Sequence, residues 1–186
     1  MPQAAGYRSP LLLWQPLPRH ARRPCKPMQD WLLDRGSLTA RLIAKSDGEF
    51  QVKVVRQVIG VPRVDERQVL GLKRPALALI REVILYGRGE PWVFARSLLP
   101  LASLTGRLRH LRKQGNRPLG AFLFSQPQLA RSAIAVARIS RDHGYVPGDL
   151  VGDQLLWGRR SVFYLQQKPL LVSEVFLPAF ANRLDR

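Results

Sequence analysis

Two charged residues stand alone in apolar rows of the sequence. At every second position of residues 77–86 the side chain is leucine or valine, except at Arg81. Glu174 is the same exception in the row it shares with leucine, valine and phenylalanine over residues 170–177. Successive side chains of a strand point to opposite faces of a sheet, so each charge should fall on an otherwise apolar face. Because burying an unpaired ion costs several kcal/mol, each must be paired, hydrogen-bonded or directed at a ligand.

The chemistry open to this pair is restricted. An arginine fork grips a carboxylate through two hydrogen bonds. A glutamate in an apolar setting tends to keep its proton near neutral pH and can act as an acid or as the partner of a hydroxyl. Together, Arg81 and Glu174 suit a small acid with an oxygen function at its far end, positioned by the arginine while the glutamate assists a proton transfer.

A structural role remains open on the pattern alone. Arg81 and Glu174 could form an ion pair with each other, or Glu82, the next residue along the strand, could pair with Arg81. Structural networks also bury charges, so the two rows do not decide between an ion pair and a ligand site.

Composition fits a single globular domain. The chain has 186 residues, of which 46% are hydrophobic and 23% charged. A net charge of +17 attracts anions, whether small carboxylates, nucleic acid or acidic lipid. The one cysteine, Cys25, excludes an intrachain disulfide, and the apolar run 11–14 is too short for a secretory or membrane segment. We therefore expect a cytoplasmic protein, acting as a monomer.

The segments that must position the two charges follow from alternation, spacing and turn residues. A proline-rich stretch over 1–27 predicts an extended or loosely docked arm, followed by one domain over 28–186. We expect strands at 49–59, 77–86, 92–99, 161–167 and 170–177. We expect helices at 28–33, 38–45 (capped by Ser37), 104–113, 121–124 and 127–141, with loops over 60–75 and 143–158. The class is α+β, with five or six antiparallel strands and the helices on one side.

Several segments, taken in order along the chain, resemble parts of one protein family. They are LIREV at 79–83, GEPW at 89–92, ARSLLP at 95–100, RPLGAFLF at 117–124, WGRRS at 157–161 and KPLLVSEVFLP at 168–178. In order and approximate spacing, from about Trp31 to Pro178, they resemble the chorismate pyruvate-lyase family. Each segment is weak evidence by itself, whereas the series is specific.

The resemblance implies a fold, a reaction and residue roles. The family converts chorismate into 4-hydroxybenzoate and pyruvate for ubiquinone biosynthesis, without a metal or organic cofactor. Its fold is a six-stranded antiparallel sheet with the ligand enclosed beneath helical flaps. Arg81 matches the arginine that holds the ring carboxylate, with help from the backbone amides at Leu38 and Leu119. Glu174 matches the carboxylate at the opposite end of the ring, near the 4-oxygen and the departing enolpyruvyl group.

Some assignments stay open within the resemblance. Arg96, Arg159 or Arg160 could neutralise the enolpyruvyl carboxylate. Leu38 stands where the family has methionine, a change that a backbone contact tolerates. The segment 141–156 is longer than the family's link at this point, which bears on flap closure and product release.

Two rival functions remain. The charge of +17 suggests nucleic-acid binding, but the basic run 107–117 follows leucines at helical spacing and is typical of a solvated face. A non-catalytic sensor of a small acid is the second, because effector-binding domains of some bacterial transcription regulators resemble the lyase fold. His20, His110 and His143 are dispersed, which does not favour a metal site.

Overall fold

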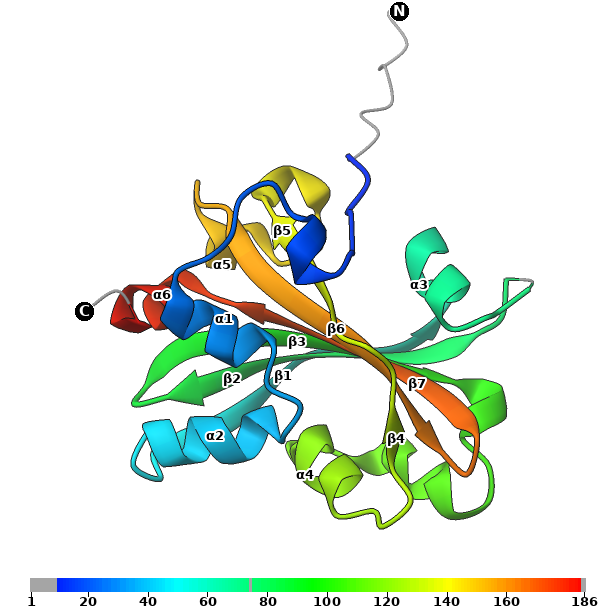
Figure 1. Cartoon of the computed structure of the whole chain (residues 1–186). Helices are drawn as coiled ribbons and strands as arrows, with labels where there is room; N and C mark the ends of the chain where they lie inside the picture. Colours follow the sequence, from blue (N-terminus) through cyan, green and yellow to red (C-terminus); the bar gives the residue numbers. More distant parts are fainter. Residues whose placement is uncertain (1–9, 74, 185–186) are drawn as a thin grey trace, which may run out of the picture.

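The computed structural model describes residues 10–73 and 75–184 and has one antiparallel sheet flanked by short helices (Figure 1). In these residues the sheet has seven strands in the order β1-β2-β3-β7-β6-β4, and β5 also pairs with β6, so the sheet is open. The strands are β1 (Phe50–Gly60), β2 (Ala78–Gly87), β3 (Glu90–Pro100), β4 (Ala130–Arg131), β5 (Ala135–Ile139), β6 (Leu156–Leu165) and β7 (Lys168–Phe176). The α+β class is confirmed, whereas the expected count of six strands is replaced by seven.

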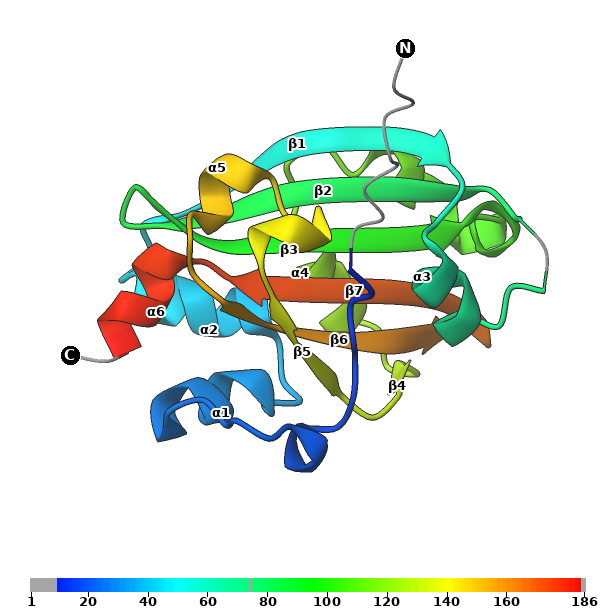
Figure 2. The ribbon, with the colours of Figure 1, turned by 90° about the horizontal axis from the view of Figure 1, so that it is seen from above.

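Short helices occupy the connections and both faces of the sheet (Figure 2). The α-helices are α1 (Lys26–Leu32), α2 (Leu38–Lys45), α3 (Val64–Val69), α4 (Leu119–Phe124), α5 (Gly148–Val151) and α6 (Pro178–Leu184). The 3-10 helices are η1 (Leu17–Arg19), η2 (Leu101–Ser103), η3 (Gly106–Lys113) and η4 (Arg141–His143). The expected placement of all helices on one side is wrong, because α2 and α4 lie over one face while α3 and α5 lie over the other.

The helix expected over 127–141 is wrong. The structure has the strands β4 and β5 there, and β5 pairs antiparallel with β6 from Ala135 opposite Arg160 to Ile139 opposite Leu156. Short apolar runs containing valine and isoleucine fit both a helix and a strand. Pairing with a distant strand decides between the two. The loop expected over 60–75 contains α3, and the one over 143–158 contains α5.

The register divides the central side chains between two faces. Arg81 lies opposite Ser97 of β3, which lies opposite Val172 of β7. We call the face carrying these three residues the pocket face; it also carries Val83 and Glu174. The far face carries the intervening side chains, among them those of Glu82, Arg96, Arg160 and Ser173.

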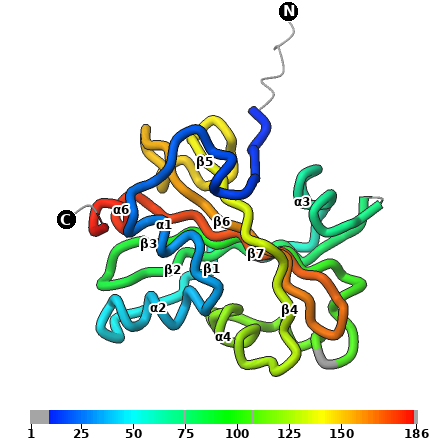
Figure 3. Tube along the Cα trace, in the orientation of Figure 1, coloured from blue at the N-terminus to red at the C-terminus, as the bar shows by residue number. Residues whose placement is uncertain are grey.

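Residues 10–25 run beside β5 (Figure 3), and their buried side chains reach the apolar clusters on both faces of the sheet. Gln15 forms a backbone bridge with Val136 of β5, and Leu12 and Leu17 are buried. The boundary at residue 27 between an arm and a domain stays a prediction. None of the helices in the described residues is long and apolar enough to cross a membrane.

Candidate functional site

A pocket opens on the pocket face between the sheet and the helices α2 and α4. Its lining comes from α2, from β1, β2, β3, β6 and β7, and from α4 with the proline before it: Thr39, Val52, Arg81, Val83, Leu85, Ala95, Ser97, Pro118, Leu119, Gly120, Leu123, Phe124, Phe163, Val172 and Glu174. Both charges singled out in the sequence line it. Its cavity measures about 40 Å³, well below the roughly 150 Å³ of a cavity that binds benzene. An aromatic acid therefore requires the covering helices to move outward.

Arg81 is a buried guanidinium without an acidic partner in the described part of the chain. Its side chain is 3% exposed, and Nη2 donates to the carbonyl oxygens of Gly115 at 2.7 Å and Arg117 at 3.2 Å. Nε is buried and has no hydrogen-bond acceptor among the described residues. Burial lowers the pKa of Arg81, because desolvation disfavours the charged form. This arrangement leaves donor capacity and uncompensated positive charge for an anion.

Two helix starts meet above Arg81. Ser37 caps α2 as expected, its hydroxyl accepting from the amide of Ala40 at 3.3 Å. Leu119, the first residue of α4, lines the pocket. Leu38, the first residue of α2, has its side chain in the apolar core instead, and its neighbour Thr39 lines the pocket. First-turn amides have no acceptor within their own helix, so they are free to bind an anion.

Glu174 lies at the other end of the pocket and is paired across strands. Its Oε2 accepts from Nε of Arg159 at 2.7 Å, and Arg159 stands directly opposite it on β6. Arg81 lies two strands away from Glu174, roughly 10 Å across the sheet. An ion pair between Arg81 and Glu174, left open by the sequence, is therefore wrong.

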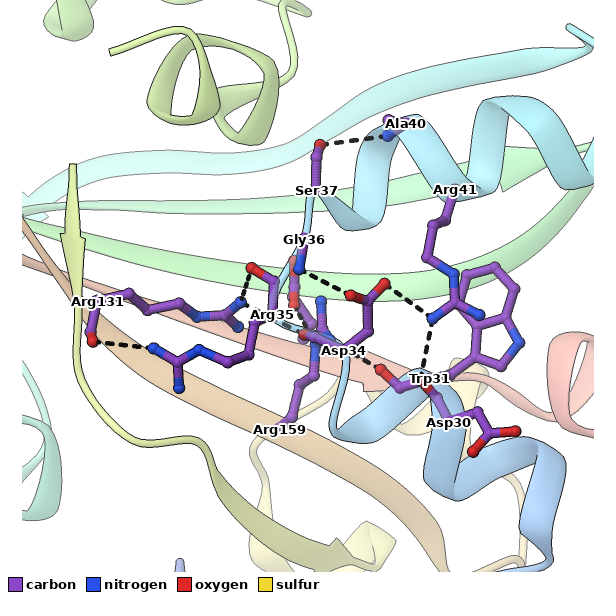
Figure 4. A network of polar contacts seen from close by, with 11 residues as sticks. Asp30, Trp31, Asp34, Arg35, Gly36, Ser37, Ala40, Arg41, Arg131 and Arg159 are labelled. Atoms are coloured by element: carbon purple, nitrogen blue, oxygen red, sulfur yellow. Dashed lines mark hydrogen bonds and ion pairs between the residues drawn. The ribbon is translucent and has the colours of Figure 1, made fainter. Parts of the chain in front are cut away.

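Arg159 also reaches the loop that leads into α2 (Figure 4). Its Nη1 donates to the carbonyl oxygens of Trp31 at 2.7 Å and Asp34 at 2.8 Å. The carboxylate of Asp34 accepts from the amide of Gly36 at 2.7 Å and from Arg41 at 2.8 Å. Although burial opposes its charge, these two hydrogen bonds lower the pKa of Asp34.

A family model described as chorismate lyase matches residues 11–184. The chain belongs to the chorismate lyase family. Two relatives named "Probable chorismate pyruvate-lyase" come from Thiobacillus denitrificans, 42% identical over 170 residues and covering 89% of each chain, and from Azoarcus sp. strain BH72, 46% identical over 176 residues and covering 90% of this chain and 91% of the other. The resemblance drawn from the serial motifs is thereby confirmed.

Solved structures of low identity share the fold of this chorismate lyase family member. The effector domain of PhnF from Mycobacterium smegmatis is 18% identical, with a TM-score of 0.56 over 79% of this chain and 91% of that chain. A GntR-family regulator from Bacillus cereus is 14% identical, with a TM-score of 0.52 over 70% of this chain and 93% of that chain. At these identities the likeness extends to the fold alone.

Two of the three arginines considered for the enolpyruvyl carboxylate are on the wrong face. Arg96 is bound on the far face by Glu66, through Nε at 2.7 Å and Nη2 at 3.0 Å, and by Glu82. Arg160 pairs there with Asp65 at 2.7 Å. Because Glu82 is engaged by Arg96, the reading of Glu82 as the partner of Arg81 is also wrong.

Three polar residues near the pocket escaped the sequence reading. Thr39 and Ser97 line it with hydroxyl groups. Ser97 had a detectable signal, since it interrupts the apolar row of β3 directly opposite Arg81. Arg131 of β4 stacks on Phe163 with its guanidinium carbon 4.9 Å from the ring centroid. The sequence did not single out Arg131, because residues 127–141 were expected to form a helix.

Proposed function

We propose that this chain is a lyase that eliminates pyruvate from chorismate and leaves 4-hydroxybenzoate, the precursor of the ubiquinone ring. The observation that carries the proposal is Arg81, a buried guanidinium without an acidic partner among the described residues, lining one pocket with Glu174. Membership of the chorismate lyase family supplies the substrate.

The substrate's ring carboxylate binds Arg81 in this proposal. The backbone amides of Leu38 and Leu119 add hydrogen bonds from the starts of α2 and α4, which enclose the ring once they close. The apolar walls of the pocket accept the ring itself. The opposite ring edge then faces Glu174, about two strand spacings away, and Arg159 supplies positive charge on the pocket face for the enolpyruvyl carboxylate.

The chemistry is a balanced elimination. The ether bond between ring C3 and the enolpyruvyl oxygen breaks, and C4 loses its proton, so the ring becomes aromatic with its 4-hydroxyl retained. The enolpyruvyl group leaves as the enolate of pyruvate and takes up one proton at its methylene carbon, which balances the proton lost from C4. Glu174 assists this proton transfer, while the protein's remaining contribution is orientation and exclusion of water. No step requires a metal or organic cofactor.

The primary test measures both products at once. Protein in buffer containing a chelator is mixed with chorismate, and pyruvate and 4-hydroxybenzoate are followed together. Equimolar appearance of both supports the lyase. A different hydroxybenzoate isomer, or no pyruvate despite tight binding of a small acid, would favour the sensor that the regulator-like fold allows. Light scattering on the same sample tests the proposed monomer, and cell fractionation its cytoplasmic location.

A substitution tests the role of Glu174. Glu174→Gln keeps the size and a hydrogen bond to Arg159 but cannot carry the proton. We expect kcat to fall by roughly 10²–10⁴, the usual worth of general acid–base catalysis, while the Kd for 4-hydroxybenzoate changes only a few-fold. Unchanged turnover would remove Glu174 from the proton transfer.

A further inference from the structure

Two guanidiniums, the buried one of Arg159 and the half-buried one of Arg131, bind the end of α1 and the loop between α1 and α2 (Figure 4). Arg159, 1% exposed, donates through Nη1 to the carbonyl oxygens of Trp31 and Asp34. Arg131 donates through Nη1 to the carbonyl oxygens of Arg35 at 2.9 Å and Asp34 at 3.4 Å. The end of α1 and the loop thus present main-chain oxygens to side chains that arise from the sheet.

The same guanidiniums bind the pocket face with their other edges. Nε of Arg159 donates to Glu174 Oε2, and Nε of Arg131 donates to the hydroxyl of Ser161 at 3.1 Å. Arg159 therefore connects Glu174 on the pocket face to the loop that leads into α2. Hydrogen bonds to a charged group are worth more than neutral ones, so this bridge is a strong local tie.

Positive charge is in excess around the loop. Arg131 is half-buried beside Arg159 and Arg35, and burial together with their charges lowers the pKa of Arg131 to about 10. Asp34 is already engaged by Arg41. Glu174 is the carboxylate that offsets this cluster from the pocket side, so its charge helps to hold the cluster together.

The loop leads into a helix that covers the pocket. Thr39 of α2 lines the pocket, and α2 meets α4 at Gly120, where an added Cβ would lie 3.0 Å from Thr39 Oγ1. Since the cavity is too small for an aromatic acid, α2, α4 or both must shift to admit or release one. Of the residues that Arg159 binds, Asp34 lies in the loop that leads into α2, and Trp31 lies in the last turn of α1.

We propose that Arg159 is a positioning residue that latches α2 over the pocket and couples this closure to the charge on Glu174. While Glu174 is ionised, it fixes the guanidinium that grips the loop. Loss of that charge leaves Arg159 held by carbonyl oxygens, and the flap loosens. Coupling of this kind is reciprocal, so opening the flap also alters the environment of Glu174. The role in product release rests on the proposed function, whereas the latch itself does not.

Hydrogen exchange followed by mass spectrometry tests the latch in the full chain. In Arg159→Gln we expect the amides of residues 34–45 to exchange about tenfold faster or more, because each lost charge-assisted hydrogen bond costs about that factor. The dissociation rate of 4-hydroxybenzoate, measured by stopped flow, should rise in parallel. Glu174→Gln should raise both in the same direction by a smaller factor.

The matched control is Arg160→Gln. Arg160 is the next residue on β6, is also buried, and pairs with Asp65 on the far face. We expect it to lower overall stability without selectively accelerating exchange over 34–45. Equal acceleration in Arg160→Gln, or wild-type exchange in Arg159→Gln, would overturn the proposal.

Two further variants keep the test decisive if Arg159→Gln does not fold. Arg159→Lys retains the charge beside Glu174 but lacks the fork, so exchange over 34–45 should still accelerate and 4-hydroxybenzoate should still dissociate faster. Arg131→Gln should accelerate exchange over 34–45 modestly, since it removes the bonds to Asp34 and Arg35. Wild-type exchange in both variants contradicts the latch. Lack of wild-type turnover would defeat the proposed function and leave the exchange comparison intact.

Discussion

Arg81 and Arg96 are buried arginines on neighbouring strands of one sheet, and they differ in what surrounds their charge. Arg96 on the far face is 8% exposed and is bound by two carboxylates, those of Glu66 and Glu82. Although burial opposes its charge, the hydrogen bond and charge of Glu66 raise the pKa of Arg96. Arg81 on the pocket face is 3% exposed, and its observed acceptors are two main-chain carbonyl oxygens.

In the proposed function, this difference separates a structural charge, that of Arg96, from a charge that binds a ligand, that of Arg81. On the far face, Arg96 and its two carboxylates close an ion network beneath α3, and Glu66 is fully buried within it. On the pocket face, Arg81 is desolvated and has no carboxylate partner among the described residues, so a ligand carboxylate would offset the cost of burying its charge. Both arginines are buried, so within the described part of the chain it is the lack of a carboxylate partner, not burial, that distinguishes the proposed binding residue.

The largest expected effect breaks the closed network. Arg96→Gln leaves Glu66 and Glu82 without their guanidinium, and removal of one partner of a buried ion pair costs roughly 3–5 kcal/mol. We expect a loss of that size in the free energy of unfolding, measured with urea at neutral pH. Arg81→Gln is the matched control and should cost far less stability, because no carboxylate of the described residues is left unpaired. Equal losses would erase the distinction between the two arginines.

Binding should reverse this order. Arg81→Gln removes the charge and the fork offered to the ring carboxylate, so we expect the Kd for 4-hydroxybenzoate to rise by about 100-fold or more. Folded Arg96→Gln, examined at low temperature, should bind within a few-fold of wild type by calorimetry. Arg81→Lys keeps the charge without the fork and should fall between the two. Normal binding by Arg81→Gln would contradict the carboxylate assignment.

Alternation in the sequence marks Arg96 as it marks Arg81, although Arg96 was considered only as a charge for the substrate, and alternation cannot tell the two arginines apart. Arg96 interrupts the apolar row of β3 just as Arg81 interrupts that of β2. Its partner Glu66 lies 30 residues earlier, in a segment whose glycine and proline residues predicted a loop, and no local pattern reports such a contact. Alternation is a local property that finds the faces of a strand, whereas the presence of a counterion depends on which distant segment packs there.

The residues of the candidate site were likewise predictable only where a local pattern or a motif marked them. Strand alternation gave Arg81 and Glu174, and the serial motifs gave Leu119, all three of which line the pocket. Arg131 was missed because β4 and β5 are set by pairing with β6, a long-range interaction that competes with helical spacing in the sequence. Arg159 was considered as a charge for the substrate, yet its bonds to Trp31 and Asp34 depend on tertiary packing.

Asp34 is a third charge to compare with Arg81 and Arg96, and its carboxylate is paired with Arg41. Its folded pKa is lowered by Gly36 and Arg41, so the stability it contributes is present above the unfolded value near 3.9 and is lost as the pH falls through the folded value. We expect Asp34→Asn to cost about 1 kcal/mol at neutral pH. The difference from wild type should shrink toward zero in acid, as measured by urea unfolding across pH. Asp30→Asn, at an exposed position in α1, should leave the curve unchanged, and a constant Asp34→Asn deficit would refute the assignment.

The smallest effects come from adding one methyl group to either face. At Gly120 a Cβ would lie 3.0 Å from Thr39 Oγ1, and at Gly158 it would lie 2.8 Å from Ile139 Cδ1 on the far face. Gly120→Ala should weaken 4-hydroxybenzoate binding a few-fold by pushing α4 away from α2, without lowering stability, because alanine favours a helix over glycine by up to about 1 kcal/mol. Gly158→Ala should do the reverse, since overpacking between β5 and β6 strains the sheet and leaves Arg81 in place. A loss of affinity in Gly158→Ala as large as in Gly120→Ala would mean that the two faces respond as one unit, and the counterion contrast would then no longer separate binding from stability.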